Sequence, residues 1–531
     1  MYSRIDDPRH WTLPAALREL AGTRPEGEWL TDSEGATLTF GKAWSESTRA
    51  AGFLERLGVA RGDRAGVFMF NSCAFVTAWM GLGHLGATAV LLNTELRGAF
   101  LRHQLNDSEV DCVIADAELL EALTALAGDL PHLKTVVVVG AMPKGRAPFR
   151  LVAWPQWAQQ PDWSGPGPSA EEIACIMYTS GTSGPSKGVL MPHAHCTLYG
   201  IGAIQCVDLQ AEDRYYISLP LFHANGLLMQ LGATLLAGVP AFIKRRFSAS
   251  SWLADIRNTR ATVTNLLGAT AGFILAQPSS GDDTSNALRA VLTAPNLPQH
   301  EALFRSRFGV ADVVSGFGMT EVNIPIWGRI GRSVPGAAGW AHEEHFEVRI
   351  ANPDTDLPVA HGQVGEILVR PKIAFGFMAG YFNAPGKTVE AWRNLWFHTG
   401  DAGTMQADGL ITFIDRIKDC IRRRGENISA SEVEAVVATM PGVAEVAAYA
   451  VPSDIQGAED EVMLALVAGP GVTLDAPDIV RRAGEQLPRF ARPRFVRVIE
   501  ALPKTATGKV QRAVLRKQGI EGALDMERPQ K

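Results

Sequence analysis

The sequence YTSGTSGPSKGVLMPHAH, residues 178–195, decides how the rest of the chain is interpreted. Between residues 179 and 188 it places hydroxyl side chains, three glycines, a proline and Lys187 shortly after the apolar run 173–177. A buried strand followed by such a loop is typical of a phosphate-binding site, because glycine backbones approach oxygens closely while hydroxyls and a lysine add donors and charge. The loop is not a Walker A motif, which requires a glycine where this chain has Ser186. A Ser/Gly linker has a similar composition, but it does not usually follow directly on a strand of core residues.

Bulk composition narrows the class of protein. A chain of 531 residues is too long for one hydrophobic core, so we expect two to four structural units. Its 46% apolar and 20% charged residues are ordinary for a globular enzyme. A net charge of −6 argues against a general nucleic-acid or anionic-membrane surface, so we expect a small-molecule substrate and no nucleic-acid partner.

The cysteines and the apolar runs indicate in which cellular compartment the protein is expected. The six cysteines are scattered without a CxxC spacing, which indicates reduced thiols in a cytoplasmic protein and no zinc site. The N-terminal residues lack the apolar segment of a secretory signal. The longest apolar run, 226–243, is interrupted by glycine, glutamine and proline, so we expect a buried helix followed by a strand and no membrane span.

Alternating helix and strand patterns predict an α/β fold. In the first block, 39–140, we expect helices at 41–58, 71–85 and 96–106, and strands at 64–70, 87–92, 110–115 and 134–139. Residues 141–170 lack periodicity and predict an irregular connection. A second block, 197–315, predicts strands near 215–219, 240–244, 262–266, 289–293 and 311–315. Short apolar strands between amphipathic helices favour two doubly wound parallel sheets.

The last third of the chain has a different pattern of predicted secondary structure. Short strands with turn signals at 347–351, 365–370 and 410–414 predict a β-rich subdomain. From Lys418 onward, small helices and strands alternate over enough residues for an α+β domain of its own. Ser431 and Glu434 have the spacing of a capping box. We therefore expect an N-terminal domain over 1–417 and a small, mobile C-terminal domain over 418–531.

Five widely separated motifs occur together and in order. They are the loop at 178–195, PLFHANG at 220–226, GFGMTE at 316–321, the pair WFHTGD at 396–401 and DRIKD at 415–419, and PKTATGK at 503–509. With them the chain resembles, over nearly its full length, the superfamily of adenylate-forming enzymes that contains acyl-CoA synthetases, peptide-synthetase adenylation domains and luciferases. RRRGENIS at 422–429 is most similar to acyl-CoA ligases of the crotonobetaine/carnitine-CoA ligase kind.

The resemblance implies a two-step reaction with ATP, Mg²⁺ and coenzyme A. An organic acid and ATP give an acyl adenylate and pyrophosphate, and a thiol then displaces AMP. In the first step an anionic carboxylate must approach an anionic phosphate. Two unit charges about 4 Å apart repel by roughly 4 kcal/mol at an effective dielectric of about 20, so cations and donors at the α-phosphate must carry much of the catalysis.

The same resemblance implies roles for individual residues. Lys509 is the expected main catalytic cation, Thr320 the hydroxyl at the α-phosphate or acyl group, and His223 the aromatic gate near the substrate carboxylate. Glu321 is the expected Mg²⁺ ligand. The residues expected to bind nucleotide or cofactor are Thr179, Ser180, Gly181, Thr182, Ser183, Gly184, Lys187, Phe317, Asp401, Arg416, Lys418 and Gly425.

Two members of that set belong to the second step. Lys418 occupies the family's hinge position, about which the small domain rotates. Gly425 would then line the thiol tunnel, where a missing side chain leaves room for pantetheine.

Each assignment has an ordinary structural alternative. Taken alone, Lys509 and Gly425 are compatible with surface turns, and Thr320 with Glu321 is compatible with a helix N-cap region. Isolated acids and bases such as Asp401 and Arg416 most often form surface ion pairs, and a lone histidine is often a satisfied, partly buried side chain.

The chain departs from the family pattern at four places. Pro185-Ser186 precedes Lys187 where a residue and then proline is commoner. Phe317 replaces the usual adenine-stacking tyrosine, and Leu-Thr-Ala-Pro at 292–295 replaces Gly-Gly-Ala-Pro. GWAHEE at 339–344 replaces a Gly/Pro-rich turn and adds bulk and acid near the expected pocket. The last two departures bear on substrate choice more than on ATP chemistry.

An acyl-CoA ligase is therefore the leading interpretation, with other acceptors open. Pantetheine is common to coenzyme A and carrier proteins, so a carrier protein is an alternative thiol partner, and some members of the superfamily activate an oxyanion such as nitrite. A non-catalytic binding relative is disfavoured because Lys187, Glu321, Asp401, Arg416 and Lys509 are all present. The missing Walker A glycine and the missing GxGxxG fingerprint disfavour an ordinary P-loop NTPase and a dinucleotide-binding enzyme.

Overall fold

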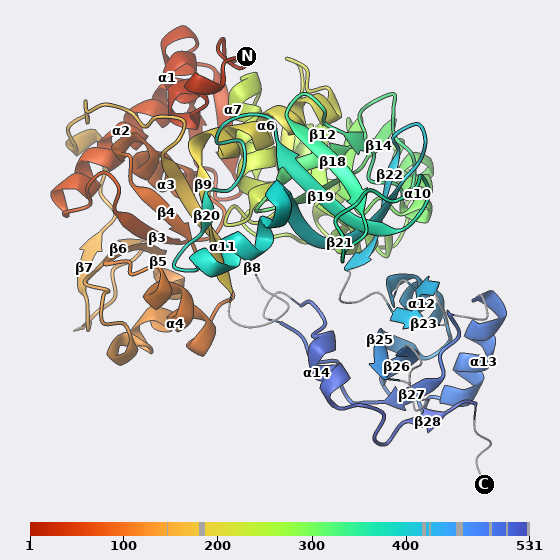
Figure 1. Ribbon diagram of the computed structural model, residues 1–531. Helices are drawn as coiled ribbons and strands as arrows, with labels where there is room; N and C mark the ends of the chain where they lie inside the picture. Colours follow the sequence, from red (N-terminus) through yellow and green to blue (C-terminus); the bar gives the residue numbers. More distant parts are fainter. Residues whose placement is uncertain are drawn as a thin grey trace.

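A computed structural model of the chain has a large N-terminal domain and a smaller C-terminal domain, which lie apart at the upper left and lower right of Figure 1. The structure describes residues 1–145, 147–179, 186–416, 421–423, 426–428, 430–452, 460–487, 491–505 and 508–527.

One large sheet of the N-terminal domain carries the ends of the glycine-rich loop. Its described strands, in spatial order, are β20 (Gly380–Tyr381), β9 (Lys187–Pro192), β8 (Ile173–Thr179), β4 (Thr88–Leu91), β3 (Arg64–Phe68), β5 (Cys112–Asp116), β6 (Thr135–Val139) and β7 (Arg150–Ala153). From β8 to β7 neighbouring strands are parallel, and β9 returns antiparallel to β8. Thr179 pairs with Lys187 in that register, so the two ends of the loop lie side by side.

A second large sheet is also mainly parallel. Its described strands, in spatial order, are β14 (Asp312–Val314), β13 (Ala290–Ala294), β12 (Val263–Leu267), β10 (Tyr215–Ile217), β11 (Ala241–Ile243), β1 (Glu28–Asp32) and β2 (Thr37–Thr39). The expected pair of doubly wound sheets is confirmed. The apolar run that we expected to be buried forms a π-helical segment η5 (Asn225–Leu231), a helix α7 (Gly232–Ala237) and β11, all within the core.

Helices cover the two sheets. They are α1 (Leu13–Thr23), α2 (Phe40–Arg56), α3 (Cys73–Leu85), α4 (Gly98–Asp107), α5 (Leu120–Thr124), α6 (His193–Val207), α8 (Trp252–Thr259), α9 (Gly268–Leu275), α10 (Pro298–Phe308) and α11 (Pro385–Ala391). Thr39 and Ser72 begin α2 and α3 as N-caps, each accepting from a backbone N–H in the first turn. Every residue of α6 except Gln205 is buried, because this helix is enclosed on all sides. None of the helices in the described part of the chain has the length and continuous apolar character needed to cross a bilayer.

Two smaller sheets form the β-rich part of the N-terminal domain. One contains β15 (Gly316–Met319), β16 (Asn323–Trp327) and β17 (Trp340–Ala341). The other contains β18 (Phe346–Ala351), β19 (Gly365–Pro371), β21 (Phe397–Met405) and β22 (Ile411–Arg416), with antiparallel neighbours throughout. The chain leaves the large domain at the end of β22 (Figure 1).

The C-terminal domain is an α+β unit with its own core. Its described elements are β23 (Ile421–Arg423), β24 (Glu426–Ile428), α12 (Ala430–Val437), β25 (Val443–Pro452), β26 (Asp460–Ala468), α13 (Ala476–Gln486), β27 (Phe495–Val498), α14 (Arg512–Lys517) and β28 (Leu524–Asp525). The strands β25 to β28 form one sheet, with apolar clusters on both faces.

The expected capping box at the start of α12 has a different function. Ser431 is the second residue of the helix rather than its cap. The Glu434 carboxylate accepts hydrogen bonds from the Ala448 backbone N–H over 2.7 Å and from Arg512 Nη2 over 2.7 and 2.8 Å. Glu434 therefore ties α12 to β25 and α14 instead of closing its own first turn.

Candidate active site

Thr179 and Lys187, which flank the glycine-rich loop, contact two side chains that are hydrogen-bonded to each other. Thr179 contacts Glu321, Lys187 contacts Tyr381, and Tyr381 donates a hydrogen bond to Glu321. Lys187 Nζ lies 4.0 Å from the ring centre of Tyr381, which reaches it because β20 pairs with β9. An ammonium over an aromatic face is held electrostatically, so the ring orients the lysine. Of the residues expected to bind phosphate, Ser180, Gly181, Thr182, Ser183 and Gly184 lie outside the described part of the chain.

Glu321 lies at the centre of this region. Its Oε1 accepts a hydrogen bond from Tyr381 Oη over 2.9 Å and a long one from Thr179 Oγ1 over 3.5 Å. The residue is 4% exposed, and among the described residues it forms no ion pair. The hard oxygens of this buried carboxylate suit Mg²⁺, whose charge would compensate that of the carboxylate.

A buried histidine fixes the backbone next to Glu321. His195, the last residue of the opening motif, has Nε2 2.9 Å from the carbonyl oxygen of Thr320 and Nδ1 3.1 Å from Asn323 Nδ2. Nδ1 also lies 3.1 Å from the Gly376 carbonyl oxygen, so the ring lies between two backbone carbonyls and the Asn323 amide. Burial lowers the pKa of His195 to about 4, which keeps the ring neutral. His195 thereby holds the carbonyl of Thr320, and with it the segment carrying Thr320 and Glu321.

The residues expected to bind the nucleoside lie on neighbouring strands. Phe317, on β15, stacks against Phe413 of β22 with ring centres 5.9 Å apart. Asp401, on β21, is directly opposite Arg416 in the β21–β22 register. The turn before Asp401 is held by Thr399, whose Oγ1 accepts from the Asp401 backbone N–H over 3.0 Å and donates to the Ile367 carbonyl over 2.7 Å. The fold therefore brings these three positions together along β15, β21 and β22.

His223 in the large domain and Lys509 in the small domain interact electrostatically. His223 is accessible to solvent although protein surrounds it on most sides. Its pKa is lowered to about 4, first by those surroundings and second by the positive charge of Lys509. The positive charge of Lys509 is therefore close enough to act on His223.

Lys509 projects from a tight loop. The Thr505 backbone N–H donates to the Lys509 carbonyl over 2.8 Å, and the Lys509 N–H donates to Thr505 Oγ1 over 3.1 Å. Gly508 has a φ of +79°, a conformation that favours glycine and makes the reversal possible. Lys509 thus lies where the chain returns alongside Thr505, directly after Gly508. The hinge and tunnel residues, Lys418 and Gly425, lie outside the described residues, as does the side chain of Arg416.

A buried polar cluster begins two residues after His223. Asn225 Oδ1 accepts from Asn265 Nδ2 over 2.9 Å and from Gln230 Nε2 over 3.3 Å, and Asn265 Oδ1 accepts from Tyr215 Oη over 2.6 Å. Gln230 is fully buried, and within the described residues its Oε1 has no hydrogen-bond partner. Such a cluster offers polar atoms to a bound molecule in an otherwise apolar layer.

Tyr381 and His195 were not among the residues expected from the sequence. Tyr381 acts through Glu321 and Lys187, both distant in the chain, and His195 acts through the backbone of Thr320. His195 could have been noticed because it ends the opening stretch, 178–195. Tyr381 lies in none of the five motifs, so the sequence carries no signal for it.

Comparison with known proteins agrees with this geometry. Residues 17–382 match the family model described as AMP-binding enzyme, and residues 432–509 match the model described as AMP-binding enzyme C-terminal domain. The chain is 31% identical to a medium/long-chain-fatty-acid–CoA ligase of Mycobacterium tuberculosis over 97% of each protein. It is 28% identical to a crotonobetaine/carnitine–CoA ligase of Shigella dysenteriae, covering 89% of this chain and 91% of that protein.

A solved structure agrees as well. An anthranilate CoA ligase in complex with anthranoyl-AMP superposes with a TM-score of 0.84 at 25% identity, over 97% of this chain and 98% of that one. The likeness extends through both domains. The chain therefore belongs to the family of AMP-binding enzymes.

Proposed function

We propose that this protein is an AMP-forming acid–CoA ligase. It activates an organic acid with ATP as an acyl adenylate, releases pyrophosphate, and transfers the acyl group to the thiol of coenzyme A. The observation that carries the proposal is the contact of Lys187 and Glu321 with Tyr381 in the large domain, together with the positive charge of Lys509 in the small domain, which acts on His223. The full-length similarity to two CoA ligases supports it.

The carboxylate of Glu321 suits Mg²⁺ as a bound metal. Glu321 would supply one carboxylate ligand, and the nucleotide's phosphates and water would supply the others, as is usual for this ion. When bound, the ion neutralises phosphate charge and polarises the phosphoryl oxygens. The hydroxyls of Thr179 and Tyr381 orient Glu321 for this role.

The nucleotide is held along the β15, β21 and β22 edge. Phe317 would stack on the base, Asp401 would accept hydrogen bonds from the ribose hydroxyls, and Arg416 would contact the ribose or phosphate. The loop that begins at Thr179 and ends at Lys187 would enclose the β- and γ-phosphates, with Ser180, Gly181, Thr182, Ser183 and Gly184 as its donors. Lys187 would then assist the departure of pyrophosphate.

Bond formation at the α-phosphate depends on Lys509. Its ammonium would bridge the substrate carboxylate and the phosphate, which offsets the repulsion between these two anions. Thr320 would donate to the α-phosphate or the acyl group. His223, kept neutral by its low pKa, would line the cleft beside the carboxylate without adding a second positive charge.

The second half-reaction requires another domain arrangement. We place the boundary between residues 417 and 418, with Lys418 as the hinge, so that the C-terminal domain removes Lys509 and brings Gly425 to a thiol tunnel. The acceptor thiol carries pantetheine, which a carrier protein would present equally well.

A pyrophosphate-release screen tests the proposal directly. The full chain is incubated with ATP, Mg²⁺ and one acid at a time, with and without coenzyme A, and the products are weighed by mass spectrometry. The panel includes alkanoic, aromatic and carnitine-like acids, polar acids that could hydrogen-bond to the Asn225 cluster, and nitrite. We expect acid-dependent pyrophosphate release in both arms and an acyl-CoA mass only with coenzyme A. Release with nitrite alone, or no release with any acid, would overturn the assignment.

A further inference from the structure

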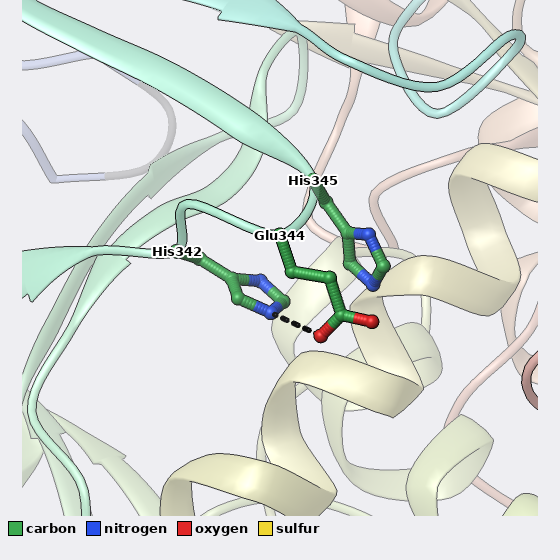
Figure 2. A group of neighbouring side chains, drawn as sticks. All are labelled: His342, Glu344 and His345. Carbon is green, nitrogen blue, oxygen red and sulfur yellow. Dashed lines mark ion pairs between the residues drawn. The ribbon is translucent and has the colours of Figure 1, made fainter.

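A turn on the N-terminal domain carries two histidines and a glutamate. His342, Glu344 and His345 lie between β17 and β18 and point toward one another in Figure 2. The turn is firmly held, because the His345 and Phe346 N–H groups both donate to the His342 carbonyl, over 3.1 and 2.9 Å. The His342 N–H in turn donates to the Pro325 carbonyl over 2.8 Å. Both imidazoles therefore project from fixed backbone.

The donor atoms have the spacing of ligands around one ion. One nitrogen from each histidine and one Glu344 oxygen lie within 4.8 Å of one another. His342 Nε2 is 3.8 Å from Glu344 Oε2, the pair joined by the dashed line in Figure 2. That separation is too long for a hydrogen bond. Two ligands of a tetrahedral ion with bonds of about 2.0–2.1 Å lie about 3.3 Å apart, which is close to the 3.8 Å between His342 Nε2 and the exposed Glu344 carboxylate.

His342 is buried without the hydrogen bonds that a buried imidazole requires. It is 4% exposed, and neither of its ring nitrogens has a hydrogen-bond partner within the described residues. Its ring packs against Trp327 at 3.8 Å between centres, while Nε2 faces Glu344. An unpartnered buried polar group costs stability, and a bound ion would remove that cost.

The cluster opens on a cavity that is separate from the active site. His342 and Glu344 line a cavity of about 1150 Å³ together with Arg329, Arg332 and Trp340. None of the residues lining it belongs to the set that we assign to ATP, Mg²⁺ or coenzyme A. The cavity provides a route for an ion and space for a water or another ligand beside it.

We propose that His342, Glu344 and His345 bind one divalent transition-metal ion, with Zn²⁺ as the preferred ion. Two imidazole nitrogens and one carboxylate oxygen suit Zn²⁺ and its neighbours rather than Mg²⁺ or Ca²⁺, which prefer oxygen ligands. The fourth position faces the cavity. This proposal is independent of the ligase reaction, and it replaces our expectation, drawn from the cysteine spacing, that the chain has no zinc site.

Zn²⁺ titration of the full chain tests the site. The protein is treated with a chelator, dialysed and titrated calorimetrically with Zn²⁺ in the absence of nucleotide. We expect one site per chain, a loss of affinity of about tenfold or more in Glu344→Gln, and no change in Glu343→Gln. Glu343 is a matched control because it is exposed on the same turn but outside the cluster.

A spectroscopic arm separates ligation from folding. Co²⁺ loading should give visible ligand-field bands in the wild type that are lost in His345→Gln and retained in Glu343→Gln, while circular dichroism stays unchanged. Glu344→Gln carries the decision if a histidine variant misfolds, because its side chain is at the surface. No stoichiometric Zn²⁺ binding, or equal affinity in Glu344→Gln and Glu343→Gln, overturns the proposal.

Discussion

The hydroxyl of Tyr381 donates a hydrogen bond of 2.9 Å to Oε1 of Glu321. The two residues come from β20 and from the segment after β15, and the bond orients the carboxylate that we assign to Mg²⁺. A hydrogen bond to a charged group contributes about 1.5–3 kcal/mol, and about 1.4 kcal/mol corresponds to a tenfold change. Tyr381→Phe should therefore lower acid-dependent ATP–pyrophosphate exchange by about tenfold or more.

The matched control for that variant is Tyr216→Phe. Tyr216 also donates to a carboxylate, Asp255, over 3.0 Å, but it lies in the second large sheet. Asp255 retains Lys244 and Ser251 as partners, so we expect near-normal exchange. Equal activity of the two variants would contradict the role of Tyr381.

Lys509→Ala should separate the two half-reactions. Without the ammonium, the two anions meet uncompensated, so pyrophosphate release should fall by about three decades or more. Thioester formation from supplied acyl adenylate should persist, because the proposed second step does not use Lys509. Lys517→Ala, an exposed lysine on α14, is the control. Normal pyrophosphate release by Lys509→Ala would refute the assignment of the catalytic cation.

Arg512→Lys tests how the Lys509 loop is anchored. Arg512 Nη2 donates to both carboxylate oxygens of Glu434, and its Nε donates to the Ala448 carbonyl over 3.1 Å. A lysine has one side-chain nitrogen and cannot bind Glu434 and Ala448 with this geometry, so the loop just before α14 should lose its fixed position. We expect adenylate formation to fall by about tenfold and thioester formation from supplied adenylate to change little, with exposed Arg482→Lys as the control. A similar fall in both half-reactions would indicate general destabilisation instead.

Buried histidines should make the N-terminal domain sensitive to acid. Burial lowers the pKa values of His84, His193 and His195 to about 3, 4 and 4. In the unfolded chain each has a pKa of about 6.5, so below that pH the unfolded state binds protons that the folded state does not. Stability should thus be fully present above about pH 6.5 and fall toward pH 4, by about 1.4 kcal/mol for each histidine at pH 5.5.

Tryptophan fluorescence during urea unfolding measures this loss for the large domain alone. All 12 tryptophans precede the C-terminal domain. His193→Gln should reduce the loss between pH 7 and pH 5.5 by about one histidine's share, and exposed His132→Gln should not. Identical pH dependence in the wild type and His193→Gln would argue against a buried neutral ring at this position.

Much of the fold could be predicted from the local pattern of apolar residues in the sequence. The strands β3, β5 and β6 are continuous apolar runs, so their burial in parallel sheets was predictable, and the family and the ligase class are confirmed. The strands β1 and β7 lay outside the predicted elements. β1 mixes polar and apolar residues, and β7 lies at the sheet edge inside a segment rich in proline and tryptophan. Strands of this kind depend on their neighbours more than on their own sequence.

The candidate site also contains some residues that the sequence predicts and others that it does not. Motif residues such as Glu321 and Lys509 could be named from the sequence, and their roles remain predictions. Tyr381 could not be named, because its partners belong to other strands. Glu434 was misread for the same reason: a spacing that fits a local cap serves a contact with Arg512, far along the chain. Local spacing cannot distinguish these cases, since only the folded chain brings the partners together.

The last strand of the large domain, β22, ends at Arg416, which lies opposite Asp401 in the sheet, and the chain continues from there into the small domain. The proposed ribose site is thus directly followed in the chain by the connection to the small domain. If the small domain rotates about Lys418 as proposed, that rotation would act first on the strand that carries Arg416, and a nucleotide bound at β21 and β22 would restrain it. Substrate occupancy and domain orientation would then be coupled at the end of β22.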